Sequence, residues 1–483
     1  MCKCTTNQFE RSRRQFLRTA SLATMSGISA SPFILGLNSL AAMAQGTGAT
    51  DYRALVCVFL QGGNDGHGTV IATDSESFAA FTQARSGAPG LAYPLANLLP
   101  IVPNTPQSGR TFALNPYLTG IQNLFNAGRA AIVANTGTLI TPATKAQVQA
   151  NSVPLPASLF SHFDQTAAWQ AIASNGGSAE HVGWGGAVAD LIESMNMNSN
   201  SMFTCISTAG IALFLAGQTS FQLNVTPAGP IPISGLANPL FGSQAGSSAL
   251  SSILSAEETN LFAKEYEVVV NRSIQAQATL ASAMLAAGPT GVPNPPQYLD
   301  PVTNMLTDNP LAASLQTVAR IIGGRASLGV NRQIFYVQLG SFDTHDGQAP
   351  THARLLTQLG RAFEYFDGLM QSSGLGNQVT TFTASDFGRT LTSNSDGTDH
   401  GWGSHHFVVG GAVQGHDMYG QYPVIGVDQA NDVGAGRLIP TTAVDQYAGT
   451  LARWFGLSNS QIQQVFPNFA NFGSSPYLGF LSS

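Results

Sequence analysis

Five short apolar runs, each followed by polar residues, constrain the fold of this chain most strongly. The clearest run, residues 54–60, is continuously apolar and ends in the glycine-rich turn of residues 61–66. A continuous run of this length is typical of a strand that is buried on both faces of a sheet. The other four expected strands are residues 130–134, 333–339, 378–383 and 407–410.

Helical periodicity separates these expected strands. It is clearest over residues 257–285, 311–322 and 352–370. Alternating strands and helices predict an α/β domain, with a mostly parallel central sheet covered by helices on both faces. We expect this domain to span residues 45–483. Residues 186–250 are rich in Asn, Ser, Gly and Pro, and we expect them to form an inserted irregular lobe or cap.

The first 44 residues are organised like an export signal. Arg13 and Arg14 are followed by Phe16 and Leu17, then by a weakly apolar segment and an Ala-Met-Ala cleavage site at residues 42–44. This pattern resembles the twin-arginine signal, so we expect the twin-arginine translocase as a partner during export and a periplasmic or secreted location. No later stretch reaches the roughly 18 uninterrupted apolar residues of a membrane span, so we expect no stable one.

Composition excludes other classes of protein. The 483 residues are 43% hydrophobic and only 10% charged, which allows a large core. Residues 45–483 carry 15 Lys and Arg against 25 Asp and Glu, a net charge of −10 that argues against nucleic-acid binding. Within that part, Cys57 and Cys205 form either one disulfide or, as we favour, two buried thiols.

Carboxylates and imidazoles follow several of the expected strands. Ligands of open α/β sheets bind at the carboxyl ends of the strands, where these side chains would meet. Six of the nine histidines fall within residues 345–352 and 400–416. Such mixed nitrogen and oxygen donors predict a divalent metal site, with zinc favoured and calcium, magnesium or manganese as alternatives. Any one of these histidines alone is better explained as a capping or core residue.

Ser161 precedes a plausible helix that runs through Trp169. Its hydroxyl has two interpretations that the sequence leaves open. It is either a nucleophile, favoured by the positive end of the helix dipole, or simply the N-cap of the helix.

Five motifs occur in a characteristic order: Gly-Gly-Asn-Asp-Gly at 62–66, Ser-His-Phe at 161–163, Phe-Asp-Thr-His at 342–345, Ser-Asp-Phe-Gly-Arg-Thr at 385–390 and Gly-Thr-Asp-His-Gly at 397–401. Together with Trp-Phe-Gly-Leu at 454–457, they resemble the exported bacterial family called domain of unknown function 1501. That family is similar to the alkaline phosphatase and sulfatase superfamily. The resemblance runs from about residue 51 to the C-terminus.

The resemblance implies an exported, metal-dependent hydrolase of phosphate or sulfate esters with a two-metal centre and a serine nucleophile. Its substrate would be a small-molecule or polysaccharide ester. The implied metal ligands are Asp65 and Asp386 for the first metal, Asp343 and His345 for the second, and Asp399 with His400 to complete the set. Ser161 would be the nucleophile, His162 would assist proton transfer or hold Ser161, and Arg389 would clamp the oxyanion.

Three departures from the superfamily pattern leave alternatives open. Asp343 and His345 are closer together than the usual D-x-x-x-H, which makes His352 a rival ligand. The usual Asp-His pair is Asp386-Phe387 here, so His400, His405 or His406 would have to supply the missing imidazole. The formylglycine signature of sulfatases is absent around Ser161. The alternative function is therefore a non-catalytic envelope or carbohydrate-binding protein with a vestigial or structural metal site.

Overall fold

The computed structural model describes residues 52–171, 182–236, 238–254, 256, 260–286 and 291–482. The expected export signal, residues 1–44, lies outside them. Among the described helices, none has the length and apolar character that crossing a membrane requires.

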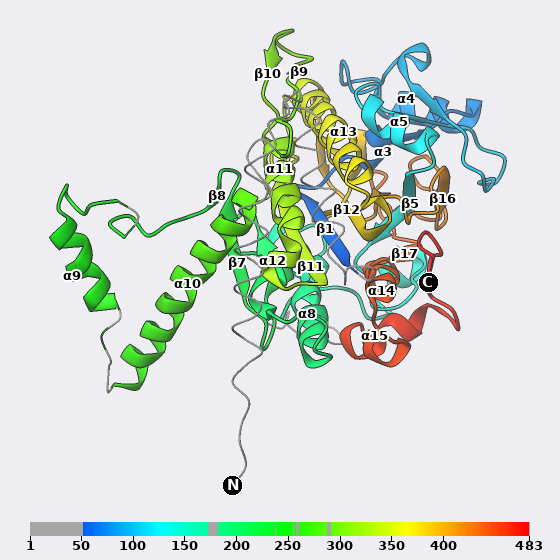
Figure 1. Cartoon of the computed structure of the whole chain (residues 1–483). Coiled ribbons are helices and arrows are strands. Elements are labelled where there is room, and N and C mark those ends of the chain that lie inside the picture. Colours follow the sequence, from blue (N-terminus) through cyan, green and yellow to red (C-terminus); the bar gives the residue numbers. More distant parts are fainter. Residues whose placement is uncertain are drawn as a thin grey trace.

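A ten-stranded sheet forms the centre of the molecule (Figure 1). Its strands, from one edge to the other, are β16 (Asp417–Tyr419), β5 (Ala130–Gly137), β15 (Ser404–Val409), β12 (Val379–Ser385), β1 (Arg53–Leu60), β11 (Arg332–Leu339), β6 (Cys205–Ser207), β7 (Gln222–Thr226) and β8 (Gly229–Pro230), with β17 (Thr442–Ala443) paired to β5. Parallel pairing joins the run from β12 to β7, whereas β15 is antiparallel to both of its neighbours. The expected α/β fold with a mostly parallel sheet is confirmed.

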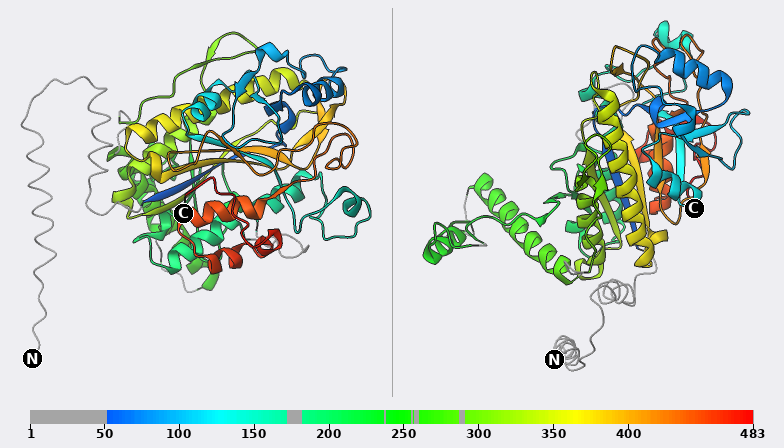
Figure 2. Two further views of the ribbon diagram at one scale, coloured as in Figure 1. Left: turned by 90° about the vertical axis from the view of Figure 1, so that its right-hand side faces the viewer. Right: turned by 90° about the horizontal axis from the view of Figure 1, so that it is seen from above.

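Helices cover both faces of the sheet (Figure 2), and β1 shows why. Its alternate residues Ala54, Val56 and Val58 belong to one core cluster, and Leu55, Cys57 and Phe59 belong to the other. The first cluster includes side chains of α5 (Thr119–Asn126), α10 (Leu261–Ala286), α11 (Pro310–Gly323), α12 (Arg325–Leu328) and α13 (Gln348–Ser372). The second includes side chains of α7 (His162–Gln170), α8 (Trp184–Ser194), α14 (Val444–Phe455) and α15 (Asn459–Val465). A strand between two apolar layers has to be apolar throughout, as the sequence indicated.

Smaller elements surround this core. They are α3 (Gly66–Thr69), α4 (Ser75–Ala84), α6 (Lys145–Gln149), a sheet of β2 (Val70–Ala72), β3 (Leu99–Ile101) and β4 (Phe112–Leu114), the pair β9 (Tyr298–Leu299) and β10 (Leu306–Thr307), and the hairpin of β13 (Arg389–Ser393) and β14 (Thr398–His400).

The segment predicted as an inserted lobe, residues 186–250, is divided in the structure. Its first part supplies most of α8 and then β6, β7 and β8, which extend the central sheet. Only its last part, which leads into α9 (Gln244–Leu254), leaves the main body (Figure 1). Cys57 and Cys205 are both free and buried, as favoured, because β11 lies between their strands.

The parallel strands β12, β1 and β11 bring the predicted site residues to one edge of the sheet. Leu60, at the end of β1, is level with Leu339 of β11 and Ser385 of β12. The backbone after β1 then passes very close to the backbone after β11. At Gly62, where φ is +116°, an added Cβ would lie 2.3 Å from the Asp343 nitrogen, so only glycine fits there.

Candidate metal centre

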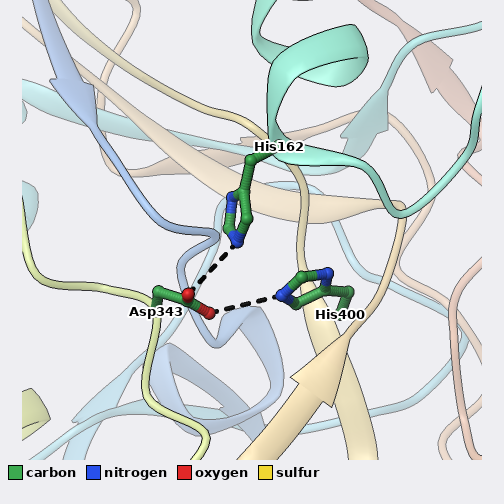
Figure 3. Close-up of side chains that lie close together, drawn as sticks. All are labelled: His162, Asp343 and His400. Carbon is green, nitrogen blue, oxygen red and sulfur yellow. Dashed lines mark hydrogen bonds and ion pairs between the residues drawn. The ribbon is translucent and has the colours of Figure 1, made fainter.

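His162, Asp343 and His400 point toward one another at this edge (Figure 3). His162 is the first residue of α7, Asp343 follows β11, and His400 ends β14. One ligand atom from each lies within 4.8 Å of the other two. The Nε2 atoms of His162 and His400 are each 3.3 Å from a different oxygen of Asp343.

Both imidazoles are fixed through their other nitrogen. Nδ1 of His162 is 2.7 Å from Oδ2 of Asp386, and Nδ1 of His400 is 2.7 Å from the carbonyl oxygen of Phe160. A carbonyl or carboxylate oxygen accepts, so each Nδ1 carries the hydrogen, and in the neutral ring Nε2 keeps its lone pair. Metal-binding histidines are oriented in this way.

His345 joins the cluster with the same arrangement. Its Nδ1 is 3.2 Å from Oδ1 of Asp399, and its Nε2 is 3.2 Å from Oδ1 of Asp343. The Nε2 atoms of His345 and His400 are only 2.8 Å apart. Two nitrogen lone pairs at this distance repel each other unless a proton or a metal cation lies between them. The donor types, imidazole nitrogens and a carboxylate, are those that a divalent cation of the zinc type takes, and the atoms of His162, Asp343 and His400 are close enough to share one.

The electrostatics of the cluster also favour a cation. The hydrogen bond between His162 and Asp386 raises the pKa of His162, and the charge of Asp343 raises it further. Burial lowers the pKa of His400. Partial burial opposes ionisation of Asp343, but the hydrogen bond from Arg389 and the charges around it hold the pKa of Asp343 below its usual value. The side chains of Asp343 and His345 are 46% and 44% exposed, so the centre is open to solvent.

The contacts of Arg389 do not agree with its prediction as a clamp for the oxyanion. Its guanidinium is completely buried and donates to the carbonyl oxygens of Gly62, Gly63 and Thr398 and to Oδ1 of Asp343. A substrate cannot reach a side chain with no exposed surface. Arg389 instead holds the turn after β1 and Asp343 in place.

The contacts of Asp65 do not agree with its prediction as the first metal ligand. Its carboxylate is buried and forms a bidentate ion pair with Arg85, at 2.5 and 2.8 Å. It also accepts hydrogen bonds from Gln348 Nε2 at 2.8 Å and from the Gly68 nitrogen at 3.0 Å. Burial opposes ionisation, but Arg85 outweighs it and holds the pKa of Asp65 far below its usual value. Both oxygens are thus committed inside the protein.

Two other predicted ligands orient histidines instead of facing the centre. Asp386 is buried, and its Oδ1 accepts a hydrogen bond from the Gly62 nitrogen at 3.0 Å while its Oδ2 accepts from His162. Asp399 accepts from His345 and, at 2.7 Å, from Asn394 Nδ2. The set of six therefore divides: Asp343, His345 and His400 converge, joined by His162, while Asp65, Asp386 and Asp399 do not.

The three rival histidines lie in the core. Nε2 of His352 is 3.1 Å from Oδ1 of Asn64, His405 stacks on Tyr422, and His406 packs beside Trp169. Burial lowers the pKa of His352 to about 4 and those of His405 and His406 to about 3, so all three are neutral. Of the three candidates for the missing imidazole, only His400 lies in the cluster, and the ring centroid of Phe387 is 4.7 Å from those of both His162 and His400.

Ser161 is the N-cap of α7, as one interpretation proposed. Its Oγ accepts a hydrogen bond from the Asp164 nitrogen at 3.4 Å, which is a long contact. The residue before it, Phe160, has a φ of +76°, which is strained for a bulky side chain. That conformation directs the Phe160 carbonyl to His400. Ser161 therefore lies between Phe160, which contacts the cluster, and His162, which belongs to it.

Sequence reasoning missed several residues of this region. Arg85 stands alone at the end of α4, and Gln348 begins α13, without any motif to mark them. The Phe160 carbonyl is a backbone atom, which no residue pattern reveals. His162 was identified by its motif, but its pairing with Asp386, 224 positions later, could not be seen in the sequence.

Fold and site together define an α/β protein with an open, histidine-rich centre at the ends of parallel strands. The sequence matches the family described as protein of unknown function (DUF1501) over residues 52–466. The chain belongs to this family, as its motifs indicated. No curated protein matches it in sequence.

Several solved structures are similar at low identity. PsFucS1 sulfatase from Pseudoalteromonas sp. is 9% identical, with 90% of this chain and 73% of that chain covered and a TM-score of 0.32. Ps i-CgsB in complex with k-i-k-neocarrahexaose is 8% identical, with 85% and 74% covered and a TM-score of 0.34. The lipoteichoic acid synthase LtaP from Listeria monocytogenes is 8% identical, with 88% and 78% covered and a TM-score of 0.29. These similarities, at TM-scores of 0.29 to 0.34, assign neither a superfamily nor an activity to this chain.

Proposed function

We propose that this protein is a metal-dependent hydrolase of phosphate or sulfate esters that holds one divalent cation. The observation that carries the proposal is the set of three imidazoles whose Nδ1 atoms are fixed by oxygens while their Nε2 atoms converge on Asp343. A pair of cations is not proposed, because Asp65 and Asp386 are committed to other contacts. Among the described residues, His162, Asp343 and His400 are the one group of three such ligands with atoms within 4.8 Å of one another, and His345 adjoins it.

The roles of the residues follow from their contacts. His162, His345, His400 and Asp343 would hold the cation, which when bound supplies Lewis-acid chemistry that polarises an ester oxygen. Asp386, Asp399 and the Phe160 carbonyl fix the three imidazoles. Ser161 Oγ would attack phosphorus or sulfur as the bond to the leaving oxygen breaks, and the hydroxyl proton would depart with that oxygen as the alcohol. Water would then attack the serine ester, and the bond to Oγ would break as Oγ takes a proton from the water, which releases phosphate or sulfate and restores the serine.

The alternative is a non-catalytic protein with a structural metal, and four ligands would suffice for a closed tetrahedral site. Solvent exposure favours catalysis, since nearly half of Asp343 and His345 is accessible. A structural site is normally shut off from water and substrate.

Export and substrate are part of the same proposal. We propose that the twin-arginine signal directs the folded chain to the periplasm or beyond, where a small-molecule or polysaccharide ester would be its substrate. Replacement of Arg13 and Arg14 by Lys should retain the precursor in the cytoplasm, and unaltered export of this variant would contradict the signal assignment.

The central test uses the chain from residue 45 onward, purified after export. We expect about one equivalent of divalent metal by elemental analysis and turnover of p-nitrophenyl phosphate or p-nitrophenyl sulfate that a chelator abolishes. His400→Ala should lose both metal and turnover. His416→Ala is the matched control, because Nδ1 of His416 also faces a backbone carbonyl, that of Phe125 at 3.2 Å, away from the cluster.

The outcomes separate the alternatives. Metal that His400→Ala removes, without turnover of any ester, would favour the structural metal site. Wild-type protein that binds no divalent metal, or His400→Ala that keeps it, would refute the proposed centre.

A further inference from the structure

A helical arm, defined here as α9 and residues 260–272 of α10, projects from the main body (Figures 1 and 2). Its large apolar side chains are exposed to a degree that is unusual for a folded monomer. Phe262 is 85% exposed and Tyr266 is 65% exposed. Leu261 and Ile253 are also exposed, as is Phe241 just before α9.

The exposed residues continue a stripe that is buried further along α10. Residues alternately four and three apart form one seam: Phe262, Tyr266, Val269, Ser273, Ala276, Leu280 and Ala283. This spacing is that of the contact face of a packed helix. Ala276, Leu280 and Ala283 are buried against the body, whereas Phe262, Tyr266 and Val269 are open. In the described part of the chain, the seam is therefore buried over its second half and exposed over its first half.

We propose that the arm of a second copy of this chain covers the open half of the seam, in antiparallel orientation. Glu265 and Arg272 flank the seam on one side and are seven residues apart. In an antiparallel pair that sets Tyr266 opposite Val269 of the second copy, Glu265 comes beside Arg272 of that copy. The two-fold axis makes this contact twice, as an isologous dimer requires.

At the base of the arm, a contact with the main body restrains Arg272, one of the two charges of the proposed pair. The Arg272 guanidinium lies 4.2 Å from the ring centroid of Phe221, which restrains it beside the seam. The described charges of the arm, Lys264, Glu265, Glu267 and Arg272, are balanced, so the arm lacks the basic character that binds anionic membranes.

The size of the contact predicts a weak dimer. Stable dimers bury about 800 Å² per partner or more, and two helix segments of three turns supply less than that. The exposed Phe241 and Ile253 at α9 would have to add to the interface. We therefore expect association that depends on concentration, with a dissociation constant of about 1 to 100 µM.

Sedimentation velocity of the exported chain over that concentration range tests the proposal. The wild type should shift from monomer to dimer, and Phe262→Glu with Tyr266→Glu should stay monomeric with an unchanged thermal melt. Ile211→Glu is the control, since Ile211 is equally exposed outside the arm, and it should associate like the wild type. A wild type that stays monomeric, or a dimer that persists in the double variant, would overturn the proposal.

Charge reversal tests the orientation. Glu265→Arg and Arg272→Glu should each raise the dissociation constant by about tenfold, because each places like charges together. The combined variant should restore association, and failure to do so would overturn the antiparallel pairing. Binding of the monomer to anionic phospholipid vesicles, lost in Phe262→Glu with Tyr266→Glu, would reassign the arm to a membrane surface.

Discussion

Two clusters of Asp and His lie at the same end of the sheet and differ in how their charges are compensated. In the deep cluster, Asp65 is paired with the buried Arg85, and His67 and His352 stay neutral because burial lowers the pKa of each to about 4. In the open cluster, three imidazoles surround Asp343, and Arg389 contacts only one of its oxygens. In the deep cluster, the charge of Asp65 is compensated by a side chain of the protein. In the open cluster, the imidazole Nε2 atoms surround a carboxylate that is accessible to solvent.

The difference teaches that residue type does not separate a ligand from a structural residue. Both clusters follow strands of the same sheet, and both carry the residues that metals prefer. What separates them is an internal cation. A carboxylate with a bidentate Arg has no oxygen left for a metal, and a histidine whose Nδ1 is fixed and whose Nε2 is free is prepared to bind one.

The largest expected effect concerns the deep cluster. Arg85→Met should lower the free energy of unfolding by about 3 to 5 kcal/mol, because it leaves a buried, uncompensated carboxylate. Urea unfolding would measure this, and Asp65→Leu added to Arg85→Met should recover much of the loss. Since Arg85 depresses the pKa of Asp65, the contribution of the pair is present above about pH 4 and is lost as the pH falls.

Arg361→Met is the control for this prediction. Arg361 is half exposed in an ion pair with Glu364 and should contribute under about 1 kcal/mol. If Asp65→Ala instead removed bound metal and left the stability unchanged, the deep cluster would be the metal site and its structural role would be refuted.

The sequence predicted the fold better than the site because the fold depends on local patterns. The apolar run of β1 and the periodicity of α11 and α13 are each contained in one segment, and all appear where expected. The expected strand at residues 407–410 begins earlier, at Ser404, because His405 and His406 are buried in it and interrupt the apolar pattern. The ion pair of Asp65 could not be foreseen, because its partner Arg85 carries no signal of its own. Contacts such as that between His162 and Asp386 arise only when distant segments fold together.

The next effect concerns Ser161. It directly precedes His162 of the open cluster, and its hydroxyl caps the N-terminus of α7. Ser161→Ala should keep its metal and lose at least about a hundredfold in turnover of any ester that the wild type cleaves. Loss of the cap alone would cost about 1 kcal/mol of stability and leave turnover nearly intact. Rate measurements beside a thermal melt separate the two results. Turnover close to that of the wild type would leave Ser161 with only its capping role.

The smallest effect concerns Asp386. This residue is buried, like Asp65 of the deep cluster, but it orients His162 of the open cluster. Asp386→Asn keeps the shape and the contact with the Gly62 nitrogen but removes the charge that fixes Nδ1–H of His162. Metal affinity should fall by about 10- to 100-fold, the usual cost of losing such a partner. Because Asp386 raises the pKa of His162, the variant should also release less metal to protons as the pH is lowered through the histidine range. Competition with a metal-binding dye at several pH values measures both effects. Unchanged affinity would show that the cation does not depend on His162, and the ligand set would then shrink to Asp343, His345 and His400.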